Sequence, residues 1–316
     1  METDTRTVWA DSIDAEIGFW SRTIAKDPGR FQRRYLRSAP ANSLLPGLVT
    51  LVEAEPVAVL DVGSGPAPVV LGRYAKRVDI VACDPLADQY QKLLEQHGIT
   101  SPVEIVNAEG EGLVEQFGAE RFHISHIQNA LDHSHQPVEV VRNMLRCTKP
   151  GGIVMIRTVI NEGANEHYHG LHQWDISPAA NDFHIRHKDG AVTAVREALA
   201  DDVQLLLQGM HCSRYGDKLQ DWMDVVLIKK GASAEFVRQV ESHFFATQIE
   251  LGRGLAGDDG GVARLRSQIA RLTAEKAAVE QSKACRLGQL LLGARRSPAR
   301  LVSLPRDLLR LRRAQA

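Results

Sequence analysis

The chain has 316 residues, of which 44% are hydrophobic, and its formal net charge is −1. This length allows one substantial core with appendages or two domains, and the composition is that of a globular protein. No run of about 18 apolar residues occurs, and the polar N-terminal segment lacks the apolar core of a signal peptide, so we expect a cytoplasmic protein without a membrane-spanning helix.

The cysteine positions and the charge distribution narrow the class further. The four cysteines lie far apart and form no Cys-x-x-Cys pair, which disfavours a disulfide framework or a thiolate zinc site. Residues 262–316 hold 13 Lys/Arg and 3 Asp/Glu, a balance of +10, so the total of −1 leaves −11 on residues 1–261. The body and the tail therefore carry opposite charge.

The N-terminal segment, residues 1–54, is expected to be helical. Ile13, Ile17, Trp20 and Ile24 recur at spacings of four and three, which predicts one or two helices between residues 11 and 36. Such a helix would either cover a ligand or pack against the core, and the sequence leaves both open.

A strand, a glycine turn and a second strand follow. Residues 57–62 are an apolar run that enters Gly63-Ser64-Gly65, and after a helix-length gap the run 78–83 ends in Asp84. The two glycines allow a tight turn and a close approach of the backbone to a ligand. Asp84, at the carboxyl end of its strand, is placed to accept both hydroxyls of a ribose, which predicts a nucleoside pocket.

Further apolar runs alternate with helical segments up to residue 231. We expect strands at 103–106, at 122–127, at 152–157 after a turn at 149–152, at 208–213 and at 222–229. Alternation of strands and helices predicts an α/β core, residues 55–231, with a mostly parallel sheet covered on both faces.

The turn after the first strand argues against a dinucleotide. A dinucleotide fingerprint has a third glycine three residues later, where this chain has Pro68. Asp61, just before the first glycine, would repel a pyrophosphate but suits a cation such as a sulfonium with its ammonium group.

These residues resemble the class I S-adenosylmethionine-dependent methyltransferases, whose first motif is an acidic residue followed by Gly-x-Gly. The Lys149-Pro150-Gly151-Gly152 turn is a further similarity. The resemblance covers roughly residues 55–230 and implies a Rossmann-like seven-stranded sheet with an antiparallel last strand. It also implies S-adenosyl-L-methionine as the cofactor, bound by Asp61, Gly63, Gly65, Asp84, Ala108, Glu109 and Asn129.

Two polar clusters after strand ends are candidates for the acceptor chemistry. A hydroxyl acceptor needs a general base, and His172 or His133 is preferred because an imidazole titrates near neutrality; Glu166 lies in the same segment. For acceptor binding we expect Tyr168, Gln173 and Trp174, whose aromatic and amide groups suit a sugar. The alternative is a solvated loop whose histidines have no specific role.

A metal site at the same segment is a further alternative. Glu166, His169 and His172 would share one face if residues 165–174 were helical, but the His-Glu-x-x-His arrangement of a zinc helix is absent. The sequence therefore assigns no metal ligand and leaves open whether a metal is used.

The C-terminal part divides into three segments. Residues 232–261 are expected to form a helix, from 236 to 251, and a glycine-rich linker. Residues 262–283 predict a coiled-coil helix, with heptad positions at Val262, Leu265, Ile269, Leu272, Lys276 and Val279. Such a short seam implies a homodimer or a partner helix, and a helix docked on the core is the alternative.

Residues 284–316 are basic and rich in leucine. This composition favours an anionic membrane surface or a protein partner, whereas the scarcity of aromatic residues disfavours nucleic acid. Residues 282–301 resemble tails that follow coiled coils in bacterial enzymes of surface-polysaccharide assembly.

The sequence thus indicates a methyltransferase that acts on a sugar hydroxyl of a surface glycan or its lipid-linked precursor, near the inner face of the membrane. Two alternatives stay open. One is a small-molecule O- or N-methyltransferase of secondary metabolism, and the other is a noncatalytic coiled-coil adapter with a degenerate core, against which the intact Gly63, Gly65 and Asp84 argue.

Overall fold

The computed structural model describes residues 2–215 and 218–255. The coiled coil expected at 262–283 and the basic segment expected at 284–316 lie outside the described residues.

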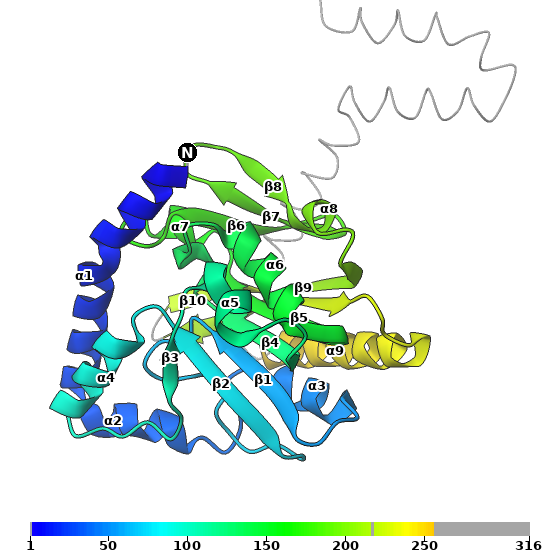
Figure 1. Cartoon of the computed structure of the whole chain (residues 1–316), viewed down its shortest axis with the longest axis horizontal. Coiled ribbons are helices and arrows are strands. Elements are labelled where there is room, and N and C mark those ends of the chain that lie inside the picture. Colours follow the sequence, from blue (N-terminus) through cyan, green and yellow to red (C-terminus); the bar gives the residue numbers. More distant parts are fainter. Residues whose placement is uncertain (1, 216–217, 256–316) are drawn as a thin grey trace, which may run out of the picture. The chain divides into compact units, whose positions relative to one another are not determined.

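A seven-stranded sheet forms the centre of the described part (Figure 1). Its spatial order is β3-β2-β1-β4-β5-β10-β9, in which β10 runs antiparallel to both its neighbours and the other pairs are parallel. The strands are β1 (Val57–Val62), β2 (Val78–Asp84), β3 (Ile105–Asn107), β4 (Phe122–Gln128), β5 (Thr148–Val159), β9 (Val203–Tyr215) and β10 (Lys218–Lys229). The predicted Rossmann-like α/β fold with an antiparallel last strand is confirmed.

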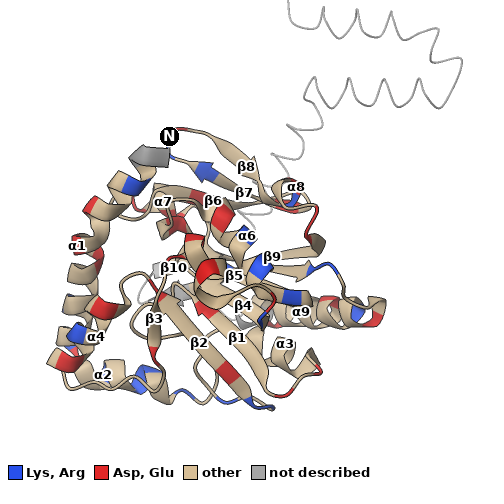
Figure 2. Ribbon diagram, in the orientation of Figure 1, with Lys and Arg blue, Asp and Glu red and all other residues tan. Residues whose placement is uncertain are grey.

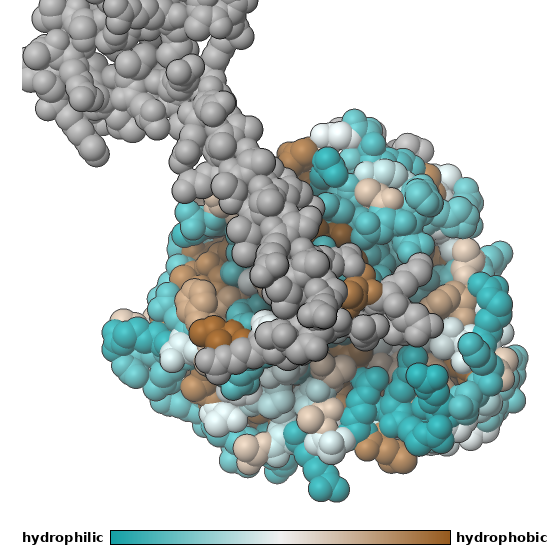
Figure 3. Space-filling view, turned by 180° about the vertical axis from the view of Figure 1, so that it is seen from behind, coloured by the Kyte–Doolittle hydropathy of each residue, from teal (hydrophilic) through white to brown (hydrophobic). Residues whose placement is uncertain are grey.

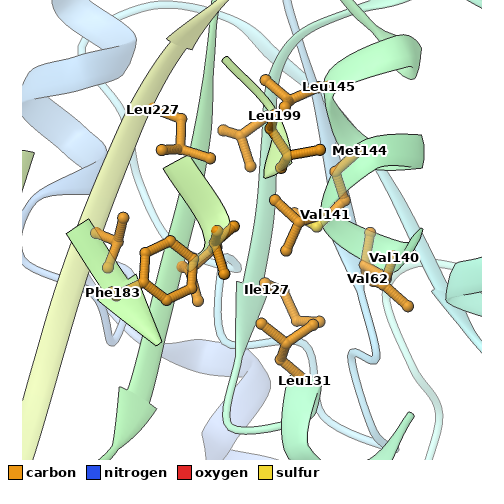
Figure 4. Packing of buried hydrophobic residues seen from close by; sticks show 14 of the residues in the cluster. Val62, Ile127, Leu131, Val140, Val141, Met144, Leu145, Phe183, Leu199 and Leu227 are labelled. Carbon is orange, nitrogen blue, oxygen red and sulfur yellow. The ribbon is translucent and has the colours of Figure 1, made fainter. Parts of the chain in front are cut away.

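Helices cover both faces of this sheet. On one face, α6 (Pro137–Cys147) places Val141 and Met144 against Val62 and Ile127 (Figure 4). On the other face, α3 (Leu45–Leu51) and α9 (Ala234–Leu255) belong to the second core cluster. Burying each large apolar side chain stabilises the fold by roughly 1.5–3 kcal/mol. Because helices cover the sheet on both faces, β1 is apolar along almost its whole length.

The N-terminal helices form a third cluster with the helix after β2. They are α1 (Glu2–Lys26), α2 (Pro28–Gln32) and the 3-10 turn η1 (Arg33–Leu36), and they pack beside α4 (Ala87–Gln96) (Figure 1). Ile24 and Phe31 are buried there with Tyr90. The predicted helices between residues 11 and 36 are confirmed, and α1 begins nine residues earlier than expected.

The segment between β1 and β2 differs from the helix-length connection expected from the sequence. Residues 66–77 form turns and contain no helix. Pro66 and Pro68 lack the backbone N–H that a helix needs, and the segment pairs instead with residues 38–41. Ala41 N donates to Val69 O at 2.9 Å, and a β-carbon at Gly72 would lie 2.4 Å from Pro40 N.

An insertion between β5 and β9 forms a second, three-stranded antiparallel sheet that the sequence analysis did not predict. It comprises β6 (Trp174–Ala179), β7 (Asp182–His187) and β8 (Val192–Ala194), followed by α8 (Val195–Ala198). Phe183 of β7 is fully buried in the cluster that α6 and the main sheet share (Figure 4). The insertion is therefore anchored to the core.

Several boundaries also shift. β5 already begins at Thr148, so the expected turn at 149–152 lies inside the strand, at the position where its register with β4 is irregular. α9 continues to Leu255, into the segment expected to be a linker. The remaining short elements are η2 (Gly110–Gly112), α5 (Leu113–Phe117), η3 (Leu131–His133) and α7 (Glu162–Asn165).

No helix among the described residues is long and apolar enough to cross a membrane. Acidic positions are spread along α1 (Figure 2), and on the reverse face hydrophobic areas are interspersed with hydrophilic ones (Figure 3).

Candidate functional site

The glycine turn after β1 has the backbone that only glycine adopts readily. Gly63 and Gly65 have φ values of +59° and +58°. A β-carbon at Gly63 would lie 2.5 Å from the β-carbon of Ala130, which follows β4. The turn is thus pressed against the segment that leads from β4 into η3.

Asp84 at the end of β2 holds this turn. Its Oδ2 accepts a hydrogen bond from Gly65 N at 3.0 Å, and its Oδ1 accepts one from Leu86 N at 2.9 Å. Burial raises the pKa of Asp84 to about 6; the two backbone hydrogen bonds oppose this rise, and the charges of Glu16 and Asp61 add to it. The carboxylate stands where the sequence placed it, at the carboxyl edge of the sheet.

Asp61 is buried beneath the same turn. Its Oδ1 lies 2.7 Å from Nδ1 of His126, the residue opposite it on β4. Its Oδ2 is buried and has no hydrogen-bond partner among the described residues. A buried carboxylate oxygen without a partner is costly, so this oxygen is a candidate contact for a donor or a cation of a ligand.

Helix α1 supplies two residues to this site whose role the sequence analysis did not assign. The indole of Trp20 lies over the turn, because a β-carbon at Gly65 would be 3.4 Å from its ring, and its Nε1 donates to Glu16 at 2.7 Å. Glu16, Asp61 and Asp84 thereby surround the turn with three carboxylates, which favours a cationic ligand. The four-and-three spacing located this helix and left open that it covers a ligand, but it did not mark Trp20 or Glu16 as residues at the site.

The other residues predicted to bind the cofactor, Ala108, Glu109 and Asn129, make contacts within the protein. Ala108 N donates to the backbone oxygen of Asp84 at 3.3 Å. Glu109 is paired with Arg6 of α1 at 3.3 Å. Asn129 has a φ of +52°, and its Oδ1 accepts from Val159 N at 3.1 Å, so its side chain ties the ends of β4 and β5 together.

A second polar cluster follows directly after Ala130. Asp132 and His133 lie in η3, and His172 comes from the loop before β6. His172 Nδ1 lies 2.7 Å from Asp132 Oδ2 and 3.2 Å from His133 Nε2. Burial opposes the charge of Asp132, but His133 and His172 outweigh it and lower the Asp132 pKa. Burial likewise opposes the charge of His172, and the Asp132 carboxylate outweighs it and raises the His172 pKa. Sequence analysis named both histidines; the structure brings them together.

Glu162 of α7 is the buried carboxylate beside this cluster. Burial raises its pKa to about 7; the charge of Asp132 adds to this, whereas His172 lowers it. Its Oε2 is buried and unpartnered among the described residues. Glu166, which the sequence favoured for catalysis, is exposed on the loop that follows. Burial at a strand end distinguishes the two glutamates, and sequence pattern does not reveal it.

The three residues expected to bind the acceptor all have partners within the protein. Tyr168 donates its hydroxyl proton to Asp175 at 2.7 Å, and Trp174 Nε1 donates to Ser134 O at 2.8 Å. The Gln173 amide donates to the backbone oxygens of Tyr168 and Gly170 and accepts from Lys188. These contacts shape the loop 167–174, and the ring of Trp174 remains half-buried.

The connection between β1 and β2, which contains no helix, indicates which kind of nucleotide the glycine turn can bind. Dinucleotide sites hold pyrophosphate at the N-terminus of the helix that follows the first strand. Residues 66–77 provide no such helix. The turn therefore suits a nucleoside ligand without a pyrophosphate.

Residues 60–156 match the family described as "Methyltransferase domain", which is 97 of the 316 residues and includes Asp61, Gly63, Gly65 and Asp84. The chain is an S-adenosylmethionine-dependent methyltransferase. No curated protein matches the chain in sequence.

Solved structures with a similar fold include two enzymes at low sequence identity. The Burkholderia thailandensis 1,6-didemethyltoxoflavin-N1-methyltransferase, solved with S-adenosylhomocysteine, is 13% identical, and the alignment covers 73% of this chain and 91% of that chain with a TM-score of 0.41. The N-methyltransferase NodS from Bradyrhizobium japonicum WM9 is also 13% identical, with 65% and 98% covered and a TM-score of 0.39.

The residues around the glycine turn of this methyltransferase fit S-adenosylmethionine. The unpartnered oxygen of Asp61 and the three carboxylates suit a ligand that carries a sulfonium and an ammonium group. Gly63 and Gly65 leave the backbone open to close approach, and Asp84 presents a carboxylate for the ribose. When bound, the cofactor supplies an electrophilic methyl group.

Proposed function

We propose that this methyltransferase O-methylates a sugar hydroxyl of a surface glycan or of its lipid-linked precursor. The observation that carries the proposal is the cluster of Asp132, His133 and His172, which stands two residues beyond the Ala130 that contacts Gly63. A hydroxyl must lose its proton as the new bond forms, so it requires a group of this kind beside the methyl donor, whereas a neutral amine does not.

Within this proposal, His172 or His133 accepts the proton of the acceptor hydroxyl. Asp132 holds Nδ1 of His172 at 2.7 Å and fixes the direction in which its ring presents Nε2. Glu166 acts at longer range, because its charge favours the protonated form of His172. The aromatic rings of Tyr168 and Trp174 form the wall of the acceptor site, and Gln173 shapes that wall through its bonds to the backbone.

The test is transfer of a labelled methyl group from S-adenosylmethionine into extracts. We expect label in cell-envelope glycans, in a form that resists mild base and yields an O-methyl sugar on hydrolysis. Label confined to soluble metabolites, or an N-methyl product, would reject the glycan and favour a small-molecule methyltransferase. Absence of cofactor binding by calorimetry would reject enzymatic function altogether.

We also propose that residues 262–283 pair two copies of the chain and that residues 284–316 bind the inner face of the membrane. The support is the heptad pattern of the first segment and the 9 Lys/Arg against 1 Asp/Glu from Lys283 onward. Each cation near an anionic surface contributes on the order of 1 kcal/mol. This arrangement would hold the enzyme where lipid-linked glycans are assembled.

A further inference from the structure

We propose that Asp132, His133 and His172 bind one divalent transition-metal ion, and that this ion holds an acceptor with two adjacent oxygen atoms. The ligand set that the sequence leaves open, Glu166, His169 and His172, differs from this one, because the three residues here come from two segments that are 39 residues apart. The binding of the ion stands on geometry alone, whereas the identity of the acceptor rests on the proposed function.

The three ligand atoms converge as they would around a metal. His172 Nδ1 lies 2.7 Å from Asp132 Oδ2, His133 Nε2 lies 3.2 Å from His172 Nδ1, and His133 Nε2 lies 3.6 Å from Asp132 Oδ2. Ligands about 2.1 Å from one ion are about 3.0 Å apart at right angles and about 3.4 Å apart at tetrahedral angles. The observed separations scatter around these values.

Hydrogen bonding between the three groups leaves one of them poorly satisfied. If His172 Nδ1 carries a proton and donates it to Asp132, His133 Nε2 faces a nitrogen whose only proton is already used. If Nδ1 carries no proton, its single lone pair would have to accept from both the Asp132 carboxyl group and His133 Nε2. A cation removes the conflict, because all three atoms can then present lone pairs to the same point.

Two buried carboxylate oxygens around the cluster also favour a bound cation. The Asp132 side chain is 1% exposed, and its Oδ1 has no hydrogen-bond partner among the described residues. Oε2 of Glu162, whose charge interacts with Asp132 and His172, is likewise buried and unpartnered. Two orphaned carboxylate oxygens next to two imidazoles form a site that a bound cation would satisfy.

A second group of ligand-type residues, Glu109, Glu111 and His135, does not have these properties. His135 Nδ1 lies 3.1 Å from Glu111 Oε1, which also accepts from Gln136 N, and Glu109 is paired with Arg6. Its members are satisfied by one another and by neighbouring residues. The cluster of Asp132, His133 and His172 is therefore the metal site that we infer.

Two imidazoles and one carboxylate favour a first-row transition metal such as Mn²⁺, Fe²⁺, Co²⁺ or Zn²⁺ over Mg²⁺, and they leave coordination positions open. An acceptor with vicinal hydroxyls, as in a sugar, would fill two of them. With the ion bound, the two histidines hold the acceptor through the ion and do not take its proton themselves. The ion lowers the pKa of the bound hydroxyl, whose proton passes to water. The oxygen takes the methyl group as the C–S bond breaks, and the sulfur keeps the electron pair.

The experiment uses the full-length protein, freed of metal with a chelator and titrated with Co²⁺ while its visible absorption is recorded. We expect one Co²⁺ per chain with the spectrum of imidazole ligation. Asp132→Asn, His133→Ala and His172→Ala should each lower the Co²⁺ affinity at least about 100-fold. The matched control is His169→Ala, an exposed histidine of the same loop, which should leave the affinity within about twofold.

Affinity for S-adenosylmethionine, measured on every variant, reports whether the fold is intact. Absence of Co²⁺ and Mn²⁺ binding in the unaltered protein, or equal binding by the three variants, overturns the inference. Full methyl transfer after chelator treatment overturns it as well but leaves the proposed function standing. Binding of Co²⁺ at this site without methyl transfer to any hydroxyl would retain the metal site and reject the proposed function.

Discussion

The indole of Trp20 covers Gly65, so that a β-carbon placed on that glycine would lie 3.4 Å from the ring. One residue comes from the N-terminal helix and the other from the turn after β1, 45 positions later. Because Trp20 also donates to Glu16 at 2.7 Å, it fixes a carboxylate beside the turn. Helix α1 thus both covers the glycine turn and packs against the core, which combines the two roles that the sequence left open for it.

Replacing Trp20 should weaken cofactor binding. Trp20→Ala removes a large aromatic surface and frees Glu16, so we expect the affinity for S-adenosylmethionine to fall about tenfold, or about 1.4 kcal/mol. Calorimetric titration measures it. Leu36→Ala is the control, because Leu36 is 75% exposed, and its affinity should stay within twofold. Equal affinities for both variants would contradict the role of Trp20.

The contact between Gly63 and Ala130 predicts a destabilising substitution with a specific rescue. Gly63→Ala would place a β-carbon 2.5 Å from that of Ala130, at a φ of +59°. Overpacking and left-handed strain together should cost about 2–4 kcal/mol of unfolding free energy. Ala130→Gly removes the clash but not the strain, so the double variant should regain about half of the loss. Denaturant unfolding measures both, and purely additive effects would contradict the contact.

Cofactor affinity should depend on pH through Asp84. Burial raises the pKa of Asp84 to about 6, so this carboxyl group is largely ionised at neutral pH and becomes protonated as the pH falls through that value. The ionised form accepts the ribose hydroxyls and attracts the cation, so affinity should be constant above about pH 7 and decline by up to about tenfold per unit below about pH 6. Calorimetry across this range measures the decline. An affinity that is flat down to about pH 5 would contradict it.

The buried ion pair between β5 and β10 should be essential for stability. Arg157 donates to both carboxylate oxygens of Asp224 at 2.6 Å and 3.0 Å, and Gln248 donates to the same group at 2.9 Å. Asp224→Ala leaves the guanidinium buried without its partner, which should cost about 3–5 kcal/mol. The control is Arg238→Ala, which breaks an exposed pair with Glu235 and should leave the denaturant midpoint unchanged. Similar midpoints for both variants would contradict this assignment.

Sequence patterns located most of the main sheet because its strands are covered on both faces. Runs such as 57–62 and 122–127 are apolar enough to be recognised alone, and the glycines and Asp84 mark the carboxyl edge. The small sheet was missed although β7 alternates buried and exposed residues, since Phe183 and Ile185 point inward. Its strands are short and are flanked by polar residues. The cluster of histidines just before them suggested a binding loop instead.

The candidate site was predictable only where its residues are near one another in sequence. His133 and His172 were both named, but nothing in their separate segments showed that they meet at 3.2 Å over Asp132. Residue type does not distinguish Glu166 from Glu162, whereas burial at the end of β5 separates the two. Long-range packing decides such relationships, and a single sequence does not encode them in a local pattern.

Deleting residues 262–316 tests the roles proposed for the C-terminal segments. The deletion removes a balance of +10 together with the heptad positions, so we expect a smaller sedimentation coefficient and weaker binding to vesicles that contain anionic lipid. Affinity for S-adenosylmethionine should stay unchanged, because the residues expected to contact the cofactor lie between 16 and 129. A shorter deletion of residues 284–316 separates the two effects: it should weaken vesicle binding and preserve the oligomer. Unchanged sedimentation and vesicle binding in the longer deletion would reject both roles. If the shorter deletion keeps vesicle binding and the longer one loses it together with the oligomer, pairing rather than the basic segment carries the membrane affinity.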